Sequence, residues 1–169
     1  MTGSYGLIGV LSDTHNHTAN LRKALGIFEQ RGVRTLIHCG DVTALSTLEW
    51  LAEFRVIYVY GNGDYTAGEM RDMLLRYDLQ NYGGPVYQGE LHGARIAAAH
   101  GHIPGSIEAM ARAGEYDYVF HGHTHRRRDE RIGRARVINP GALGGVHREE
   151  RSICLVDLAA GQVEFVLLE

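Results

Sequence analysis

The sequence is poor in cysteine and has no long apolar run. Its two cysteines, Cys39 and Cys154, cannot form a disulfide framework, and without a CxxC pair they suggest neither a zinc knuckle nor a redox motif. No apolar stretch reaches about 18 residues, so we expect no transmembrane helix. The first residues carry no basic segment, and the apolar stretch 7–11 is too short for a signal peptide. We therefore expect a cytoplasmic protein that has no membrane as a partner.

A strong net charge of either sign is also missing. With a net charge of −3 at pH 7, the chain has no basic field that would attract nucleic acid, and we expect no nucleic acid as a partner. The 169 residues are 44% hydrophobic and 22% charged, which is close to the globular average and excludes a disordered chain. This length predicts a single domain over residues 1–169. The composition leaves open whether the protein forms a homo-oligomer.

Strand-like and helix-like segments alternate through roughly the first half of the chain. Apolar, β-prone runs lie at 5–12, 33–38 and 55–60, and helical periodicity follows each of them. This order favours a largely parallel sheet with right-handed crossovers. A capping box formed by Thr66 and Glu69 is expected to open the third helix.

Hairpins dominate after Pro85. The expected strand pairs are 86–91 with 95–100, 126–130 with 134–138, and 152–157 with 162–167. A further strand is expected at 116–120, and Ser106 is expected to cap a short helix. The whole pattern predicts two packed sheets with helices outside them.

Five of these strands are followed by short polar segments that suit metal binding. The segments are Asp13-Thr14-His15, Gly40-Asp41, Gly61-Asn62-Gly63-Asp64, His100-Gly101-His102 and Gly122-His123-Thr124-His125. Because open α/β sheets bind ligands beyond the carboxyl ends of their strands, we expect these segments to meet.

Each segment alone also has a purely structural explanation. Asp13 could cap the following helix, and Gly40-Asp41 and Gly61-Asn62 are common turn sequences. His100 could be a buried core histidine. Five such coincidences at strand ends that point the same way are improbable, so the segments together favour a metal site.

The chemistry of the donors restricts the metal. Carboxylates, one amide and several imidazoles, with no thiolate, suit Mn, Fe, Zn or Ni better than Cu(I), Mg or Ca. Seven or more ligands exceed what one tetrahedral zinc ion takes. We therefore expect two divalent ions about 3.5–4 Å apart that share a bridging carboxylate.

The order of these motifs, followed by Asn139-Pro140-Gly141, resembles the calcineurin-like metallophosphoesterase superfamily, and its small single-domain bacterial and archaeal phosphodiesterases in particular. The resemblance implies an α/β fold, a four-layer αββα sandwich of two mixed β-sheets flanked by helices. It also implies a ligand set for each metal: Asp13, His15 and His125 for one, Asn62, His100 and His123 for the other, with Asp41 as the bridge.

The sequence also departs from the family pattern. Many larger members carry a histidine directly after the Gly-Asn pair, thought to protonate the leaving group, whereas this chain has Gly63. We expect the neighbouring Asp64 to order the loop. His17 and His102 are candidates for a proton donor or a phosphate contact, although a plain surface role is equally open. The residues expected to serve catalysis are Asp41, Asn62, Asp64, His100 and His102.

The arginine-rich segment 126–136 allows two interpretations. It could grip a phosphate-bearing substrate, or it could be a solvated strand face balanced by Asp129 and Glu130.

These observations predict an enzyme that hydrolyses phosphodiester bonds of a small phosphate ester. The expected nucleophile is a hydroxide held between two divalent ions, with Mn as the expected metal. The alternatives are a metal-dependent phosphomonoesterase or phosphatase of the same fold and a non-catalytic scaffold that binds proteins. A nuclease would need a groove or an extra domain for which 169 residues leave little chain.

Overall fold

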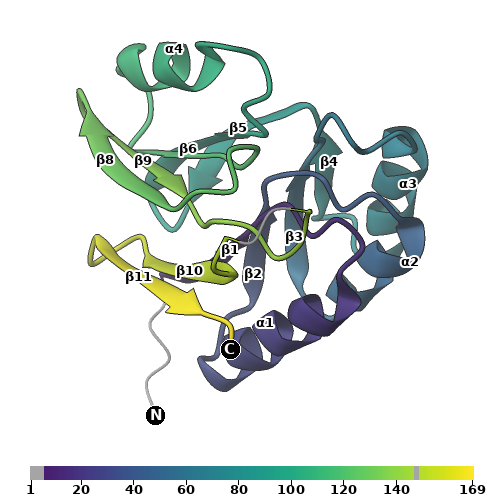
Figure 1. Cartoon of the computed structure of the whole chain (residues 1–169). Coiled ribbons are helices and arrows are strands. Elements are labelled where there is room, and N and C mark those ends of the chain that lie inside the picture. Colours follow the sequence, from purple (N-terminus) through teal and green to yellow (C-terminus); the bar gives the residue numbers. More distant parts are fainter. Residues whose placement is uncertain (1–5, 147–148) are drawn as a thin grey trace.

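The computed structural model describes residues 6–146 and 149–169, whose strands form two β-sheets (Figure 1). The first sheet has the order β11 (Gln162–Leu167), β10 (Ser152–Asp157), β1 (Leu7–Leu11), β2 (Thr35–His38), β3 (Arg55–Val59) and β4 (Tyr82–Gly84). The second has the order β5 (Val86–Leu91), β6 (Ala94–Ala99), β7 (Tyr118–Phe120), β9 (Ala135–Asn139) and β8 (Arg128–Ile132).

Both sheets are mixed. Strands β1 to β4 run parallel, and the β10/β11 hairpin joins β1 in antiparallel orientation. Strands β6, β7 and β9 are parallel, whereas β5 and β8 are antiparallel to their neighbours.

Helices cover the outer face of each sheet. The first sheet is covered by α1 (Thr18–Gln30), α2 (Leu45–Leu48), the short 3-10 helix η1 (Glu49–Leu51) and α3 (Ala67–Tyr77), and the second by α4 (Ser106–Arg112) (Figure 1). This arrangement confirms the predicted four-layer αββα sandwich. Within the part of the chain that the structure describes, no helix combines the length and apolarity needed to cross a membrane.

The alternation of side chains along the strands builds three apolar layers. In β3, Val56 and Tyr58 pack with the helices, while Ile57 and Val59 pack between the two sheets. The second sheet contributes Ile96 to that central layer, and its opposite face packs against α4. The sheets are therefore stacked face to face.

The elements appear in the predicted order, but several local details differ. Thr66 precedes α3 without a capping hydrogen bond from its side chain, so the predicted capping box is wrong. Ser106 is also not a cap, because Gly105 holds that position with φ +76° and the Ser106 hydroxyl donates to the carbonyl of Ile103.

Strand limits differ as well. Strands β1, β2 and β7 are shorter than the predicted runs, and Tyr5, the start of the first run, lies outside the described residues. Strand β4 is missed by the sequence analysis because two of its three residues are glycines, which are depleted in strands.

Candidate metal centre

The five predicted segments meet at the carboxyl ends of their strands. Across the two sheets, His125 Nε2 lies 3.2 Å from Asp13 Oδ1, and His100 Nε2 lies 3.4 Å from Asp41 Oδ2. The segment after β3 joins them, because the Gly63 N–H donates to Asp41 Oδ1 at 2.7 Å. Stacking of the sheets thus brings together residues that are more than 100 positions apart in the chain.

Two overlapping groups of donor atoms result. Asp13, His15 and His125 form one group, and Asp13, Asp41 and His100 form the other, with the donor atoms of each group within 4.8 Å of one another. The two groups also approach each other, since His15 Nε2 lies 3.7 Å from Asp41 Oδ2. The first group contains the three ligands implied for one metal, and Asp41 Oδ2 lies close both to His15 in that group, at 3.7 Å, and to His100 in the other, at 3.4 Å.

Three further predicted residues lie at the rim of this cluster. His123 is exposed, and its ring centroid is 5.1 Å from that of His100. His102 is also exposed, with its ring 5.6 Å from the ring of His100. Asn62 is exposed between two glycines whose backbones lie against Asp41. Their side chains are therefore accessible beside the two buried carboxylates.

The donor set fits divalent cations. Asp13 Oδ1 and His100 Nε2 are both buried, and neither has a hydrogen-bond partner in the described parts of the chain. Such buried polar atoms are costly unless an ion completes them. The Nδ1 atom of His100 lies 2.6 Å from the carbonyl of Cys39, and donation to that carbonyl leaves the lone pair of Nε2 pointing into the cluster.

Donor spacing supports the same conclusion. His15 Nε2 and His125 Nε2 are 3.2 Å apart, and each ring nitrogen lies 3.2–3.7 Å from Asp13 Oδ1. Two donor atoms that bind the same ion, each at about 2.1 Å, are separated from each other by roughly 3–3.5 Å. The observed spacings are close to this range.

The carboxylates are held in their charged form. Burial opposes the charge on Asp13, but contacts with His125 and His15 and the nearby His100 lower the pKa of Asp13 below its usual range. Burial likewise opposes the charge on Asp41, yet its contact with His100 lowers the pKa of Asp41. Two ionised carboxylates this close together in a buried site favour a cation.

Asp64 supports the bridging aspartate through the backbone. One of its oxygens, Oδ2, accepts hydrogen bonds from the N–H groups of Asp41 and Gly61, and Oδ1 accepts from Thr43, each at 2.8 Å. Asp64 is itself buried. Both carboxylate oxygens are thus directed at the loops after β2 and β3, which is the loop-ordering position expected of it.

Two supporting residues were not assigned a role in the sequence. Fully buried His38 lies with Nε2 at 2.8 Å from Thr14 Oγ1 and with Nδ1 at 3.2 Å from the Gly40 N–H, so it joins the first two ligand loops. Ser12 donates its hydroxyl to Asp13 Oδ2 at 2.6 Å. The available signal was a histidine at the end of an apolar strand, two residues before Gly40.

Two other histidines near the ligand loops have separate positions. His17 is the N-cap of α1, where its Nδ1 accepts from the Asn20 N–H at 3.4 Å, so the cap is His17 and not Asp13. His121 is buried next to the loop after β7, and burial lowers the pKa of His121 to about 4.

Unusual backbone conformations concentrate at this site. In the described ranges, eight residues other than glycine have positive φ, and all except His92 lie on the ligand loops. They include Asp13 at +52°, Asp41 at +58° and the β-branched Thr43 at +72°. Such conformations cost free energy and persist where surrounding contacts enforce them, often at functional sites.

Most arginines of the segment 126–136 are engaged in ion pairs. The pairs are Arg127 with Glu150, Arg128 with Glu108 and Glu130, Arg134 with Asp117, and Arg136 with Asp129. Of the two interpretations of this segment, a solvated strand face balanced by Asp129 and Glu130 therefore applies to the β8/β9 hairpin itself.

A cleft of about 960 Å³ opens beside the metal ligands. Its lining includes His15, His123 and His125, and it continues to residues 126–128, Val146 and Glu149. The cluster is therefore accessible to a ligand larger than an ion.

Comparison with known proteins agrees with this geometry. Residues 7–161 match the family described as the calcineurin-like phosphoesterase superfamily domain. A phosphodiesterase from Methanocaldococcus jannaschii is 32% identical over 164 residues, which cover 96% of this chain and 99% of that protein.

Solved structures are also similar. One, described as a novel archaeal phosphodiesterase, has a TM-score of 0.91 at 32% identity and covers 96% of this chain and 99% of its own. Vps29 from Entamoeba histolytica, complexed with Zn²⁺, has a TM-score of 0.67 at 21% identity over 96% of this chain and 98% of its own, and supports the fold alone.

Proposed function

The chain belongs to the calcineurin-like phosphoesterase superfamily, and on that basis we propose that it is a phosphodiesterase whose reaction uses two divalent metal ions. The observation that carries the proposal is the pair of overlapping donor groups, which share Asp13 and of which the second contains Asp41. Seven donors on five loops exceed the four ligands of a tetrahedral ion and the six of an octahedral one. We assign Asp13, His15 and His125 to one ion, Asn62, His100 and His123 to the other, and Asp41 to both.

The metals and the protein divide the chemistry. When bound, two divalent cations supply a water of lowered pKa as nucleophile and neutralise the charge of the phosphate. Asp41 is held for its bridging position by the Gly63 N–H on one oxygen, while its other oxygen faces His15 and His100. His100 is oriented by the Cys39 carbonyl. The protein thus positions its ligands before the substrate arrives, which phosphoryl transfer requires.

His102 is exposed beside the buried carboxylates, as are the assigned metal ligands Asn62 and His123, and this exposure supports a role for His102 at the substrate. We assign to His102 a role in contacting the phosphate or in giving a proton to the departing oxygen. At position 63 the chain has no side chain that could do so. Leaving groups that are stable as anions should therefore react fastest.

The limited positive charge that the protein offers to a phosphate favours diesters over monoesters. A phosphodiester carries one negative charge, whereas a monoester carries nearly two and needs more cationic support. Three arginines of the β8/β9 hairpin, Arg128, Arg134 and Arg136, are already paired with carboxylates of the protein. Manganese is the metal we propose, since a donor set of carboxylate, amide and imidazole suits it.

The decisive experiment loads metal-free protein with Mn²⁺ and compares bis(4-nitrophenyl) phosphate with 4-nitrophenyl phosphate. We expect two metal ions per chain by elemental analysis and a higher kcat/KM for the diester at neutral to mildly alkaline pH. Equal or faster hydrolysis of the monoester would favour a phosphatase instead. Tight metal binding without turnover of either ester would favour a scaffold, and one ion per chain at saturation would refute the binuclear centre.

A further inference from the structure

The cleft beside the metal centre is larger than the reacting group requires. Its volume of about 960 Å³ is at the upper end of the range of roughly 300–1,000 Å³ for sites that hold small molecules. Beyond His15, His123 and His125, its lining continues along residues 126–128 and reaches Gly145, Val146 and Glu149. The cleft therefore offers space to a part of the substrate attached to the phosphate.

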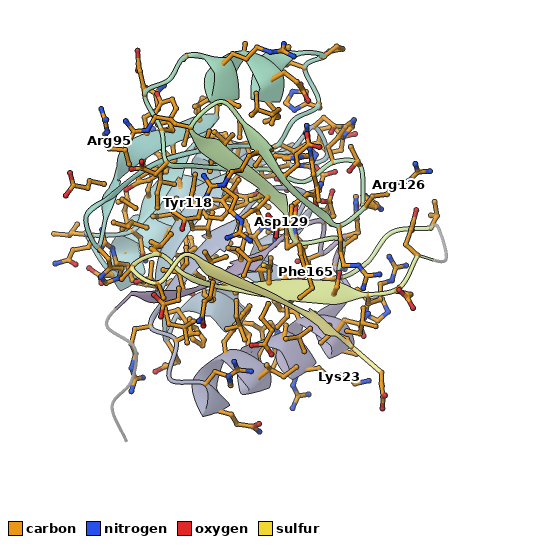
Figure 2. All side chains as sticks on the ribbon, turned by 90° about the vertical axis from the view of Figure 1, so that its left-hand side faces the viewer. Lys23, Arg95, Tyr118, Arg126, Asp129 and Phe165 are labelled. Carbon is orange, nitrogen blue, oxygen red and sulfur yellow. The ribbon has the colours of Figure 1, made fainter. Side chains whose placement is uncertain are left out.

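Three consecutive arginines border this extension, and their charges are not equally available. Arg127 Nη2 lies 2.6 Å from a carboxylate oxygen of Glu150, and Arg128 Nη1 lies 3.1 Å from one of Glu108. Arg126 is exposed at the periphery of the molecule (Figure 2), and its guanidinium has no hydrogen bond or ion pair with any residue that the structure describes. Of the three, Arg126 is the cation available to a ligand.

Thr124 and Asn139 hold the backbone of Arg126 in place. Its N–H faces Thr124 Oγ1 at 3.4 Å, and the same oxygen accepts a hydrogen bond from Asn139 Nδ2 at 3.0 Å. Asn139 is fully buried at the end of β9, and its Oδ1 accepts from the Gly141 N–H at 2.9 Å. Because the backbone next to His125 is already fixed, Arg126 loses less conformational entropy when it binds an anionic group.

Glu149 gives the cleft a second, opposite charge. It lines the cleft, and its Oε2 lies 3.9 Å from Arg151 Nη1. Because Arg151 balances part of the charge of Glu149, Arg126 is the charge that favours an anionic group in this part of the cleft. The charges therefore suit a ligand with one additional anionic group better than a polyanion.

We propose that Arg126 is a specificity-determining residue that binds a second anionic group, such as a terminal phosphate, on the arm of the phosphodiester that is retained after cleavage. This inference rests on the proposed phosphodiesterase function. The retained arm stays attached to phosphorus throughout, so its binding can stabilise the transition state. The planar guanidinium suits phosphate oxygens because it donates two parallel hydrogen bonds. The substrate class is then a phosphodiester whose retained arm carries a further phosphate.

Two esters with the same leaving group test the inference: the 4-nitrophenyl ester of thymidine 5′-phosphate, with and without a 3′-phosphate. In the Mn-loaded enzyme we expect kcat/KM to be higher for the 3′-phosphorylated ester. Arg126→Ala should lower the ratio of the two values about tenfold, and Arg126→Lys should lower it less, because lysine keeps the charge without the paired donors. The ratio should also fall at high salt, which screens an exposed charge.

Arg112→Ala is the matched control, because Arg112 is an exposed arginine at the end of α4, outside the lining of the cleft. It should retain the ratio of the unmodified enzyme. A ratio that is the same in Arg126→Ala and in the unmodified enzyme would overturn the inference while leaving the proposed function intact. If neither ester nor bis(4-nitrophenyl) phosphate is cleaved by the unmodified enzyme, both the proposed function and this inference fail.

Discussion

Replacement of Asp64 by asparagine tests whether this residue acts by holding the loop of the bridging aspartate. In the folded protein, Asp64 Oδ2 accepts from Asp41 and Gly61, and Oδ1 accepts from Thr43. An asparagine can keep its single oxygen on the first two donors, but its amide group then faces the N–H of Thr43. One backbone donor is left without an acceptor.

The size of the effect follows from that count. Loss of this part-buried hydrogen bond to a charged carboxylate costs about 1–3 kcal/mol, and for a domain of this size each kcal/mol lowers Tm by about 2–4 °C. Asp64→Asn should therefore lower the Tm of the metal-free protein by about 2–12 °C. Asp64→Ala leaves three donors without acceptors and should cost about 3 kcal/mol or more, a large share of the about 5–15 kcal/mol that stabilises a typical domain.

Differential scanning calorimetry measures these changes, and metal titration against a chromophoric chelator measures the second consequence. Because Asp64 positions the backbone of Asp41, Asp64→Asn should weaken metal binding by about 10–100-fold. The control is Asp72→Asn, which removes an exposed ion pair with Arg71 and should change stability by no more than about 0.5 kcal/mol. An unchanged Tm in Asp64→Asn, within the range of the control, would refute the reasoning.

Three further substitutions probe the centre itself. Asp41→Ala should abolish activity and lower the binding of both metals together, and wild-type turnover by this variant would contradict the binuclear centre. His102→Ala should lower kcat while elemental analysis still finds about two ions per chain; loss of metal would instead identify His102 as a ligand. Gly63→His should flatten the dependence of rate on leaving-group pKa, measured with a series of aryl diesters. The backbone of Gly63 has no positive φ, but an added Cβ would lie only 3.0 Å from Asp41 Oδ1, so the metal content of this variant must be measured as well. A steep dependence that persists with two ions bound would show that a missing acid is not its cause.

The sequence predicted the layers of the fold because the periodicity of apolar residues reports burial directly. Alternation in β3 sends Val56 to the helices and Ile57 to the other sheet, and continuous apolar runs of this kind are typical of strands buried on both faces. Polar residues directly after such runs stand out for the same reason. Asp13, Asp41 and His100 could therefore be identified as candidate metal donors from the sequence, without coordinates.

Local capping could not be predicted in the same way. Thr66 and Glu69 have the right spacing for a capping box, yet the side chain of Thr66 makes no such bond. At α1 the cap is His17 and not Asp13, whose carboxylate is taken up by contacts with Ser12 and with the loop after β7. The competing partners belong to other elements, so spacing along the chain does not reveal them.

Only the tertiary structure decided which donors belong to one group and which charges stay available. His15 and His125 are brought to Asp13 because the two sheets stack with their carboxyl ends at one edge. In the sequence, Arg126 is indistinguishable from its two neighbours. It differs from Arg128 because Glu108 of α4 and Glu130 of β8 lie next to Arg128, and no residue in the described chain does this for the guanidinium of Arg126. Chemical type is a property of the sequence, whereas the pairing of charges depends on distances that packing alone sets.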